Sequence, residues 1–490
     1  MPLPAIALFD SVDYPSAASI LLRPINPLRI TAKIQDRQGL NRGRAREIKL
    51  PAAILRPSFL IRWVRAHIHS LISLAVRAVA VLLGFVVTFL IGHNYGPEAN
   101  GHYALITQSG MLLSVIAVGG IDMAVVRKLS EAVAKKIPVE RATLLKLVAY
   151  SLGFAALLST ILALSSHWAL PVLFKGEPPR DALLLIILIL FARALTRLMS
   201  SILRSQKAYT WGQLVEALFI PLIVVVAILV APHMTVDTIL WVTAIGGLAT
   251  GAVALISSLP YTASGGDTLH VPMADVLKVA LPLWGVAIFL NISEWYSLAS
   301  ASAVLGVHEA GLYRVAIQVA SALGIVTMGL FSVYSPQISA ANAGSNKREV
   351  AALARSATRL SLLFSLPVAL AIFIFAPEIL NVIGPEFAEA APVLRIVIVG
   401  QAVYTATGPS GLVLAMTGHE KINFWLTMSS TAALLVSAPL AAYFAGLVGI
   451  SIAVAVVTIA RNLGSFYAVW KKEGINVMTG HIHKAPLSAP

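Results

Sequence analysis

Long apolar stretches separated by short polar segments fill most of the chain. A helix that crosses the hydrocarbon core of a membrane needs about 20 apolar residues, and stretches of that length recur from residue 71 to residue 470. Runs such as LLLIILILFA at 183–192 lack the apolar and polar alternation of the strands in a membrane barrel. The pattern therefore predicts an all-α polytopic membrane protein.

The apolar stretches predict about twelve transmembrane spans. They cover residues 71–93, 102–126, 143–165, 181–203, 213–232, 237–258, 276–303, 309–335, 352–376, 390–416, 421–443 and 446–470. An even number of spans places both termini on the same side of the membrane. No predicted loop is longer than about twenty residues, which excludes an extramembrane catalytic domain.

Lysine and arginine are concentrated on one predicted side of the membrane. The first 67 residues hold eleven Lys or Arg and four acidic residues. Loops predicted on the same side repeat this excess, for example at Arg127, Lys128, Lys347 and Arg348. Because cytoplasmic segments of membrane proteins carry the excess of Lys and Arg, we expect both termini in the cytoplasm.

The basic N-terminal segment and the spans divide the chain into five parts. We expect a basic cytoplasmic tail at 1–67, an N-terminal six-helix lobe at 68–258, a cytoplasmic linker at 259–275, a C-terminal six-helix lobe at 276–472 and a cytoplasmic tail at 473–490. The first tail lacks the apolar core and cleavage site of a signal peptide. It is either a disordered extension, including the case of a start codon assigned too far upstream, or, around 50–70, a helix lying on anionic headgroups.

Two fourteen-residue segments resemble each other. YGPEANGHYALITQ at 95–108 and LGVHEAGLYRVAIQ at 305–318 share two glycines, a tyrosine and a glutamine. Each segment opens a six-helix half of the chain. Glycine at these positions can end one helix and begin the next in a tight turn, and we expect Tyr103 at the membrane interface. The repeat predicts two pseudo-symmetric six-helix lobes with a substrate path between them.

Composition removes several kinds of chemistry. The chain is 58% hydrophobic and 12% charged, with a mean hydropathy of +0.83, and it has no cysteine for disulfides or thiolate metal sites. It has no GxxxxGK(S/T) phosphate loop, HExxH zinc motif or DxD carboxylate pair. We therefore expect no catalytic residues, no metal and no cofactor. Driven transport would need an ion gradient (proton or sodium), the membrane potential, or consumption of product on the far side.

Charged residues inside the spans are the main functional clue, because they are costly in a membrane and usually face a protein interior or a wet cavity. Eight cations lie in predicted spans, against the two carboxylates Glu216 and Glu294. The cations are Arg77, Lys146, Arg193, Arg197, Arg314, Arg359, Arg395 and Arg461. Those near cytoplasmic ends can instead extend to the interface, and Glu216 could pair with Arg197. An excess of Arg in a cavity implies an anionic ligand, and the planar guanidinium fits a lipid phosphate or pyrophosphate.

Polar side chains share helix faces with these charges. Asn291 and Glu294 lie on one face of the seventh span, and Gln318 follows Arg314 on the eighth. Gln108 is the counterpart of Gln318 in the first copy of the repeat. We expect Gln108, Gln318 and Asn291 to line the cavity. Glu294, the deep carboxylate, is the candidate for binding a coupling proton or ion.

Two long segments carry a family resemblance. Residues 82–131, which include the first repeat, and residues 335–396, with APEIL at 376–380 followed by Gly, Glu and Phe, resemble bacterial O-antigen and polysaccharide flippases of the multidrug/oligosaccharidyl-lipid/polysaccharide exporter superfamily. The resemblance covers about 68–472 and implies two six-helix lobes that form a V around a cationic cavity. It implies a multi-pass protein of the bacterial inner membrane that moves a polyprenyl-pyrophosphate-linked oligosaccharide to the outer leaflet by alternating access, for exopolysaccharide or O-antigen (lipopolysaccharide) synthesis.

The resemblance also implies where this substrate binds. Basic cavity residues hold the pyrophosphate in the family, a role that we assign to Arg77 and Arg314, with Arg461, Arg193 and Arg197 as further candidates. The expected partners are the anionic lipid-linked oligosaccharide, membrane lipids, and the polymerase and chain-length machinery of the same pathway, with no nucleic acid.

Three other functions remain as alternatives. A lipid II flippase is poorly separated from an O-antigen flippase by sequence. A cation-coupled drug exporter of the same superfamily would need acidic residues in the cavity, where Arg is in excess here. A polysaccharide polymerase would need a large external loop with catalytic Arg or His, and the longest predicted external loop, 166–180, is too short.

Overall fold

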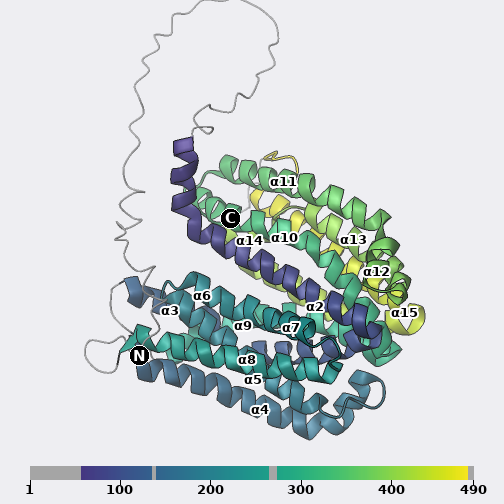
Figure 1. The fold of residues 1–490 in the computed structure, drawn as a ribbon. Helices are drawn as coiled ribbons and strands as arrows, with labels where there is room; N and C mark the ends of the chain where they lie inside the picture. The colour runs from purple at the N-terminus through teal and green to yellow at the C-terminus, as the bar shows by residue number, and fades with distance from the viewer. Residues whose placement is uncertain (1–56, 135–138, 264–272, 484–490) are drawn as a thin grey trace, which may run out of the picture. The chain divides into compact units, whose positions relative to one another are not determined.

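The computed structural model describes residues 57–134, 139–263 and 273–483 (Figure 1). The chain separates into two units, Met1–Trp63 and Val64–Pro490. The first unit contributes only the start of helix α2 to the described residues. The predicted N-terminal tail at 1–67 therefore lies largely outside them, as does the middle of the predicted linker at 259–275.

Helices form nearly all of the second unit. The first half of the chain contains α2 (Pro57–Val118), α3 (Ile121–Ala134), α4 (Arg141–Phe174), α5 (Ala182–Ser205), α6 (Tyr209–Gln213), the π-helix η1 (Leu214–Leu218), α7 (Phe219–Val230), α8 (Val236–Ser258) and the 3₁₀-helix η2 (Leu259–Tyr261). The second half contains α9 (Met273–Leu305), α10 (Val307–Ala343), α11 (Lys347–Ile374), α12 (Ala376–Ile383), the 3₁₀-helix η3 (Pro385–Ala390), α13 (Ala391–Ala406), α14 (Ser410–Met416) and α15 (Glu420–Glu473).

Two short strands connect parts of the first half. Strand β1 (Val139–Glu140) pairs in parallel with β2 (Thr262–Ala263), with Val139 opposite Thr262 and Glu140 opposite Ala263. The pairing brings the start of α4 next to the end of the α8 and η2 segment. Both strands lie where short polar connections were predicted.

Two helices contain a break and each holds two predicted spans. Helix α2 is interrupted at Gly96, with φ 80° and ψ −177°, and Pro97 follows. Helix α15 is interrupted at Ala445 and Gly446. At 1.5 Å per residue, a straight helix of 54 residues would be roughly 80 Å long, far more than a membrane is thick. The positive φ of Gly96 and Gly446 is a conformation that only glycine adopts at little cost.

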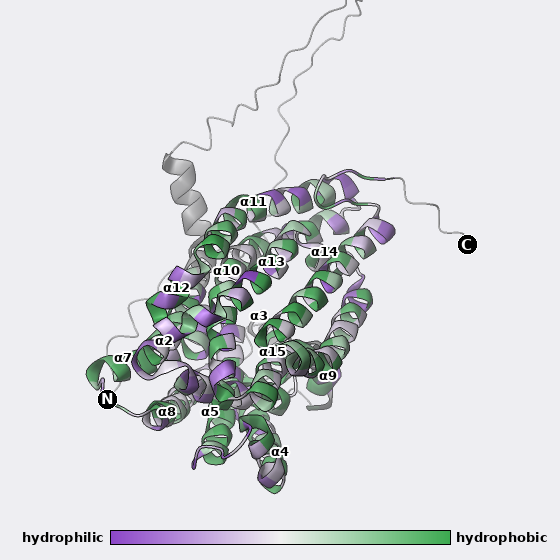
Figure 2. Cartoon of the chain, turned by 90° about the vertical axis from the view of Figure 1, so that its right-hand side faces the viewer, coloured by the Kyte–Doolittle hydropathy of each residue, from purple (hydrophilic) through white to green (hydrophobic). Residues whose placement is uncertain are grey.

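The helices have the length and surface of membrane spans. Nine helices among the described residues are long and apolar enough to cross a membrane, and with the breaks in α2 and α15 they are compatible with the twelve predicted spans. Hydrophobic residues cover most of the length of the helices in Figure 2, and hydrophilic residues gather near their ends. Large side chains that would be buried in a soluble protein are exposed, including Leu164 at 74% and Phe444 at 80%. The protein is therefore an all-α, multi-pass membrane protein, as predicted.

One apolar cluster joins the two halves of the chain. It includes Leu105 of α2, Leu185 of α5, Leu298 of α9, Tyr313 of α10 and Leu394 of α13, all buried. A second cluster, around α3 and α5, also takes in Val276 and Ala280 of α9, and a third lies within the second half, around α10, α14 and α15. The two halves therefore share apolar interior at more than one place.

The residues after α15 fold back onto the second half. Ile475 and Val477 are fully buried, and the Val477 carbonyl accepts a hydrogen bond of 3.1 Å from Thr358 Oγ1 on α11. Glu473, at the end of α15, forms an ion pair with Lys347 (3.0 Å), and its other carboxylate oxygen lies 3.3 Å from His419 Nδ1. The segment at 474–483, which was predicted to be part of a tail, is thus packed against α11, and the end of α15 is joined to the starts of α11 and α15.

We expect the variant Glu473→Gln to be less stable, because the Glu473 side chain is 9% exposed and the neutral amide cannot form the ion pair with Lys347. The loss should be about 1–2 kcal/mol in the free energy of unfolding, measured as a lower thermal midpoint in detergent. The matched control is Glu378→Gln, where the carboxylate is exposed. Equal midpoints for the two variants would contradict the assignment.

Candidate functional site

The two copies of the repeated segment contact each other. A Cβ atom on Gly101 would overlap the carbonyl oxygen of Val307, and a Cβ atom on Gly311 would overlap the carbonyl oxygen of Pro97. The contact is reciprocal, because Gly311 and Val307 are the counterparts of Gly101 and Pro97 in the other copy. Gly306 has φ 129° and repeats the helix break of Gly96. These features support the predicted duplication of the chain.

A cavity of about 140 Å³ lies directly beside this contact. It is formed by both parts of α2, by α5, by α7 and by α10. Its lining residues are Gly84, Val87, Thr88, Asn100, Tyr103, Ala104, Thr107, Gln108, Met111, Arg193, Ile220, Pro221 and Arg314. Asn100, which precedes Gly101, places the cavity immediately next to the crossing of the two turns.

Two arginines from different halves of the chain meet at the cavity. Arg193 comes from α5 and Arg314 from α10, and the Tyr103 hydroxyl interacts electrostatically with both. With its amide oxygen turned toward α10, Gln108 accepts hydrogen bonds from the two terminal guanidinium nitrogens of Arg314, at 3.0 and 3.2 Å. Gln108 thus holds the Arg314 guanidinium in place without neutralising its charge.

The side-chain oxygen of Asn100 on α2 is a hydrogen-bond acceptor that has no partner within the described residues. Asn100 is 1% exposed and donates a hydrogen bond of 2.9 Å from Nδ2 to the Thr88 carbonyl across the break in α2. Its Oδ1 atom is buried and has no hydrogen-bond partner within the described part of the chain. Because an unpartnered buried polar atom costs free energy, this oxygen is suited to a ligand or to water in the cavity.

The charge of the cavity is positive. Of the described residues that line it, two are arginines and none is acidic. Glu294 on α9 interacts electrostatically with Arg314, but its side chain is exposed and is not part of the lining. Buried guanidinium groups need an anionic partner or many hydrogen bonds, so the cavity can hold a small anion that accepts hydrogen bonds.

The structure brings together some of the residues predicted for this site and leaves others apart. Arg193, Arg314 and Gln108 line the cavity, and the Gln318 amide nitrogen lies 3.9 Å from the position of a Cβ on the lining residue Gly84. Five other predicted residues do not line the cavity. Arg77 is exposed on α2, Asn291 donates to the Ala287 carbonyl of its own helix, and Arg461 on α15 interacts with Tyr404. The other two are Glu294 and Arg197.

The predicted pairing of Glu216 with Arg197 is wrong. Arg197 Nε lies 2.6 Å from Asp122 Oδ2, whereas Glu216 accepts from Arg204 at 2.9 Å and from Ser200 at 2.8 Å. Asp122 opens α3 directly after the two left-handed glycines at 119 and 120, and this bend brings it against α5. Glu216 lies in the π-helix η1 and meets α5 nearer to its C-terminal end.

Sequence reasoning assigned Tyr103 to the membrane interface and did not single out Asn100. Tyr103 lines the cavity instead, and its hydroxyl accepts a hydrogen bond of 3.5 Å from Thr243. The repeat contained a signal for both residues, because Asn100 precedes Gly101 directly and Tyr103 follows it by two positions. A close backbone crossing at a glycine brings neighbouring side chains into the same enclosed region.

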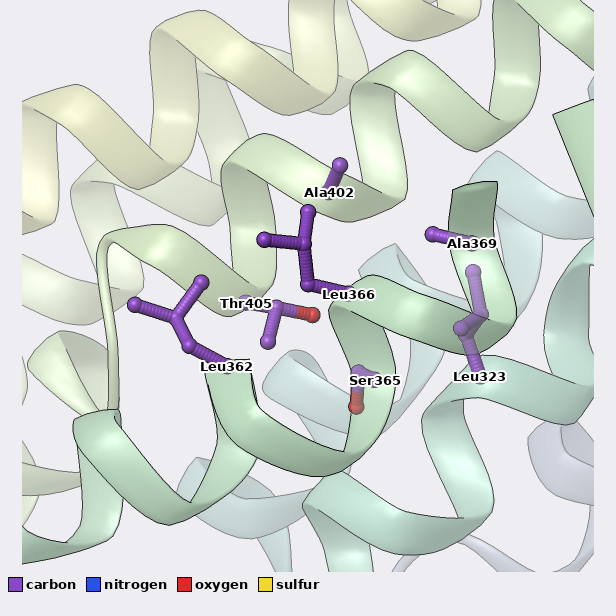
Figure 3. A pocket seen from close by; sticks show the side chains of 7 residues that line it. All are labelled: Leu323, Leu362, Ser365, Leu366, Ala369, Ala402 and Thr405. Carbon is purple, nitrogen blue, oxygen red and sulfur yellow. The ribbon is translucent and has the colours of Figure 1, made fainter. Parts of the chain in front are cut away.

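A second hollow lies in the second half, between α10, α11 and α13 (Figure 3). Its walls are mostly aliphatic, with Leu323, Leu362 and Leu366 around the hydroxyls of Ser365 and Thr405. It has no room for a water molecule. It is therefore a packing defect in an apolar region, and the arginine-lined cavity is the better candidate for a binding site.

Known structures share this fold. An inward-facing multidrug resistance MATE family transporter of the MOP superfamily matches with a TM-score of 0.67 and 15% identity, over 81% of this chain and 94% of that chain. The lipid II flippase MurJ in an inward closed conformation matches with a TM-score of 0.67 and 14% identity, over 82% of this chain and 87% of that chain. An outward-facing MATE family transporter matches with a TM-score of 0.54 and 15% identity, over 82% and 95% of the two chains.

Family models match most of the chain. No curated protein matches the sequence. A family model described as MatE matches residues 282–442, and one described as "Polysaccharide biosynthesis protein" matches residues 69–342, more than half of the chain. The resemblance that the sequence indicated is thereby confirmed: this chain is a multi-pass membrane protein that belongs to the polysaccharide biosynthesis protein family, with the transporter fold of the MOP superfamily.

Proposed function

We propose that the protein is a flippase for a polyprenyl-pyrophosphate-linked oligosaccharide. It moves the oligosaccharide from the inner to the outer leaflet of the bacterial inner membrane, for exopolysaccharide or O-antigen synthesis. The observation that carries this proposal is the cavity in which Arg193 and Arg314 converge without an acidic lining residue. In a polysaccharide biosynthesis family, the anion that such a pair suits best is the pyrophosphate of the lipid carrier.

The roles of the cavity residues follow from their contacts. Arg193 and Arg314 bind phosphate oxygens, and Gln108 positions the Arg314 guanidinium through the hydrogen bonds at 3.0 and 3.2 Å. The Tyr103 hydroxyl can donate a hydrogen bond to a phosphate oxygen, and the free Asn100 Oδ1 atom can accept one from water or from a hydroxyl of the ligand. We propose that Arg77 and Arg461, which lie outside the cavity lining, contact the substrate elsewhere on its path, as do Asn291 and Gln318. No step of this cycle requires covalent chemistry, so the protein acts as a transporter rather than an enzyme.

The contact between the two turns supports an inward-facing state. It closes the end of the molecule that the distribution of Lys and Arg assigns to the outside. The TM-score is higher with the inward-facing MATE family transporter (0.67) than with the outward-facing one (0.54), which agrees with this state. In alternating access, the substrate would then enter from the cytoplasmic leaflet, and both termini would lie in the cytoplasm. Membrane lipids, a polymerase and chain-length machinery are the proposed partners.

A lipid II flippase is the second candidate, because its substrate also carries a pyrophosphate on a polyprenyl chain and the MurJ fold matches this one. A drug exporter is disfavoured, because a cationic drug would be repelled by the two lining arginines. The polysaccharide product formed in cells separates the first two candidates: an O-antigen or exopolysaccharide flippase would restore a surface glycan, whereas a lipid II flippase would restore cell-wall growth.

We expect Arg193→Ala and Arg314→Ala each to lower glycan export by about tenfold to a hundredfold, because a charge-assisted hydrogen bond contributes roughly 1.5–3 kcal/mol. Export is measured as surface glycan in a strain that lacks its own flippase. In detergent, inorganic pyrophosphate should raise the thermal midpoint of the unsubstituted protein more than that of either variant.

The matched control is Arg359→Ala, because Arg359 is an exposed arginine on α11. It should retain export and the pyrophosphate response. Normal export by both cavity variants would show that the two arginines do not bind the substrate.

The ion pair between Arg197 and Asp122 should stabilise the fold. Because the two side chains are 22% and 8% exposed, Asp122→Leu or Arg197→Met alone should lower the free energy of unfolding by about 2–3 kcal/mol. The double variant should lose less than the sum of the two single losses. Thermal unfolding of all four proteins measures this coupling. Additive losses would instead show that this ion pair does not stabilise the fold.

Glu294 is the proposed carrier of a coupling proton or ion. Glu294→Gln keeps the shape of the side chain but cannot bind a proton, so a proton-coupled flippase should export more slowly and lose its response to a pH gradient. Transport of a fluorescent lipid-linked oligosaccharide into proteoliposomes measures both. An export rate equal to that of the unsubstituted protein across the pH range would exclude this role.

A further inference from the structure

The crossing of the two turns is a contact between backbones. A Cβ on Gly101 would overlap Val307 O, a Cβ on Gly311 would overlap Pro97 O, and the amide nitrogen of Gly101 would lie only 3.0 Å from the latter Cβ. Side chains can move out of the way of a methyl group, but a helix backbone cannot move without displacing the helix. An alanine at either glycine therefore forces α2 and α10 apart.

Other contacts at the same end also join the two halves. Lys175, at the end of α4, donates a hydrogen bond of 2.9 Å to the carbonyl of Leu305, the last residue of α9. The His93 ring nitrogen Nδ1 lies 3.2 Å from the carbonyl of Ile383 at the end of α12. In each of these two contacts, a residue of the first half meets the C-terminal end of a helix of the second half. Both contacts would break if the two halves separated at this end of the molecule.

The cavity lies immediately below this crossing. Asn100, which lines it, precedes Gly101, and Arg314, which also lines it, follows Gly311 by three residues. A separation of α2 and α10 at the glycines would therefore uncover the arginines from this end of the molecule.

We propose that the paired glycine turns at 95–101 and 305–311 form the outer gate of the transporter, which is closed when the two backbones are in contact. Gly101 and Gly311 make closure sterically possible, and the Lys175 to Leu305 hydrogen bond holds the gate shut. Bulk at either glycine shifts the equilibrium toward the outward-open state. The proposal rests on the proposed function only for the assignment of this end to the outside of the cell.

The absence of cysteine from the chain permits a direct test. Met111 lines the cavity, so Met111→Cys is a reporter for a membrane-impermeant maleimide added to intact cells. In a chain that carries only this substitution, labelling from outside should be slow. Adding Gly101→Ala or Gly311→Ala should raise the labelling rate by about fivefold or more.

The matched controls are Gly324→Ala and Gly153→Ala. Both glycines lie inside helices, the first on α10 itself, and a Cβ on either would have no heavy atom within 4 Å. Their labelling rates should equal that of the reporter alone. Lys175→Met removes the hydrogen bond to Leu305 without adding bulk at the crossing, so it should raise the labelling rate less than the alanine substitutions do. It provides a second gate variant if an alanine variant does not fold.

Three results would overturn the gate. The labelling rate could be unchanged in all three gate variants, or it could rise equally in the two control variants. It could also rise only when the maleimide is added to inside-out vesicles, where it reaches the protein from the cytoplasmic face. Labelling requires no glycan. A protein that passes this test but exports no glycan would therefore contradict the proposed substrate and leave the gate intact.

Discussion

Close approach of two helix backbones is the constraint on which the rest of the arrangement depends. Helices normally lie 8–10 Å apart because side chains separate them, and glycine removes this spacer where small residues permit closer packing. At Gly101 and Gly311 the backbones of α2 and α10 meet. The breaks at Gly96 and Gly306 let each helix start at the angle that this contact requires. The arginine-lined cavity lies next to this contact, because Asn100 and Arg314 in its lining are close in sequence to Gly101 and Gly311.

The second constraint is electrostatic. Two guanidinium groups face one enclosed space, and their contacts there are the neutral amide of Gln108 and the Tyr103 hydroxyl. Glu294 and Glu216 interact electrostatically with Arg314 and Arg193, but neither carboxylate lines the cavity. By contrast, Arg197 and Arg204, on the same helix as Arg193, form direct ion pairs with Asp122 and Glu216. The arginines that support the fold thus have a carboxylate within ion-pair distance, whereas no such pair is found for the two cavity arginines within the described residues. This difference is the physical basis for assigning them to substrate.

Much of this could be predicted from sequence. Hydrophobic periodicity predicted the helices, because each must cover about 30 Å of hydrocarbon with apolar residues, and the repeat located the turns that meet. Arg193, Arg314 and Gln108 were identified as intramembrane polar residues. Their grouping with Asn100 and Tyr103, and the pairing of Arg197 with Asp122, depend on how helices are rotated and bent. Rotation and bend arise from tertiary packing and from the glycines at 119 and 120, and local pattern does not encode them.

The contact between Gly101 and Val307 and the contact between Gly311 and Pro97 have the geometry of an isologous interface, in which the same patch meets itself across a two-fold axis. Such an interface is what a homodimer of six-helix subunits would have used before their genes fused. A symmetric dimer would have to carry the same residue at both copies of a position. In the fused chain, Ala104 and Arg314 occupy equivalent positions, so a single strong charge faces Gln108 without a second one opposing it. A fused chain can therefore place different residues at the two copies of one position, as it does at Ala104 and Arg314.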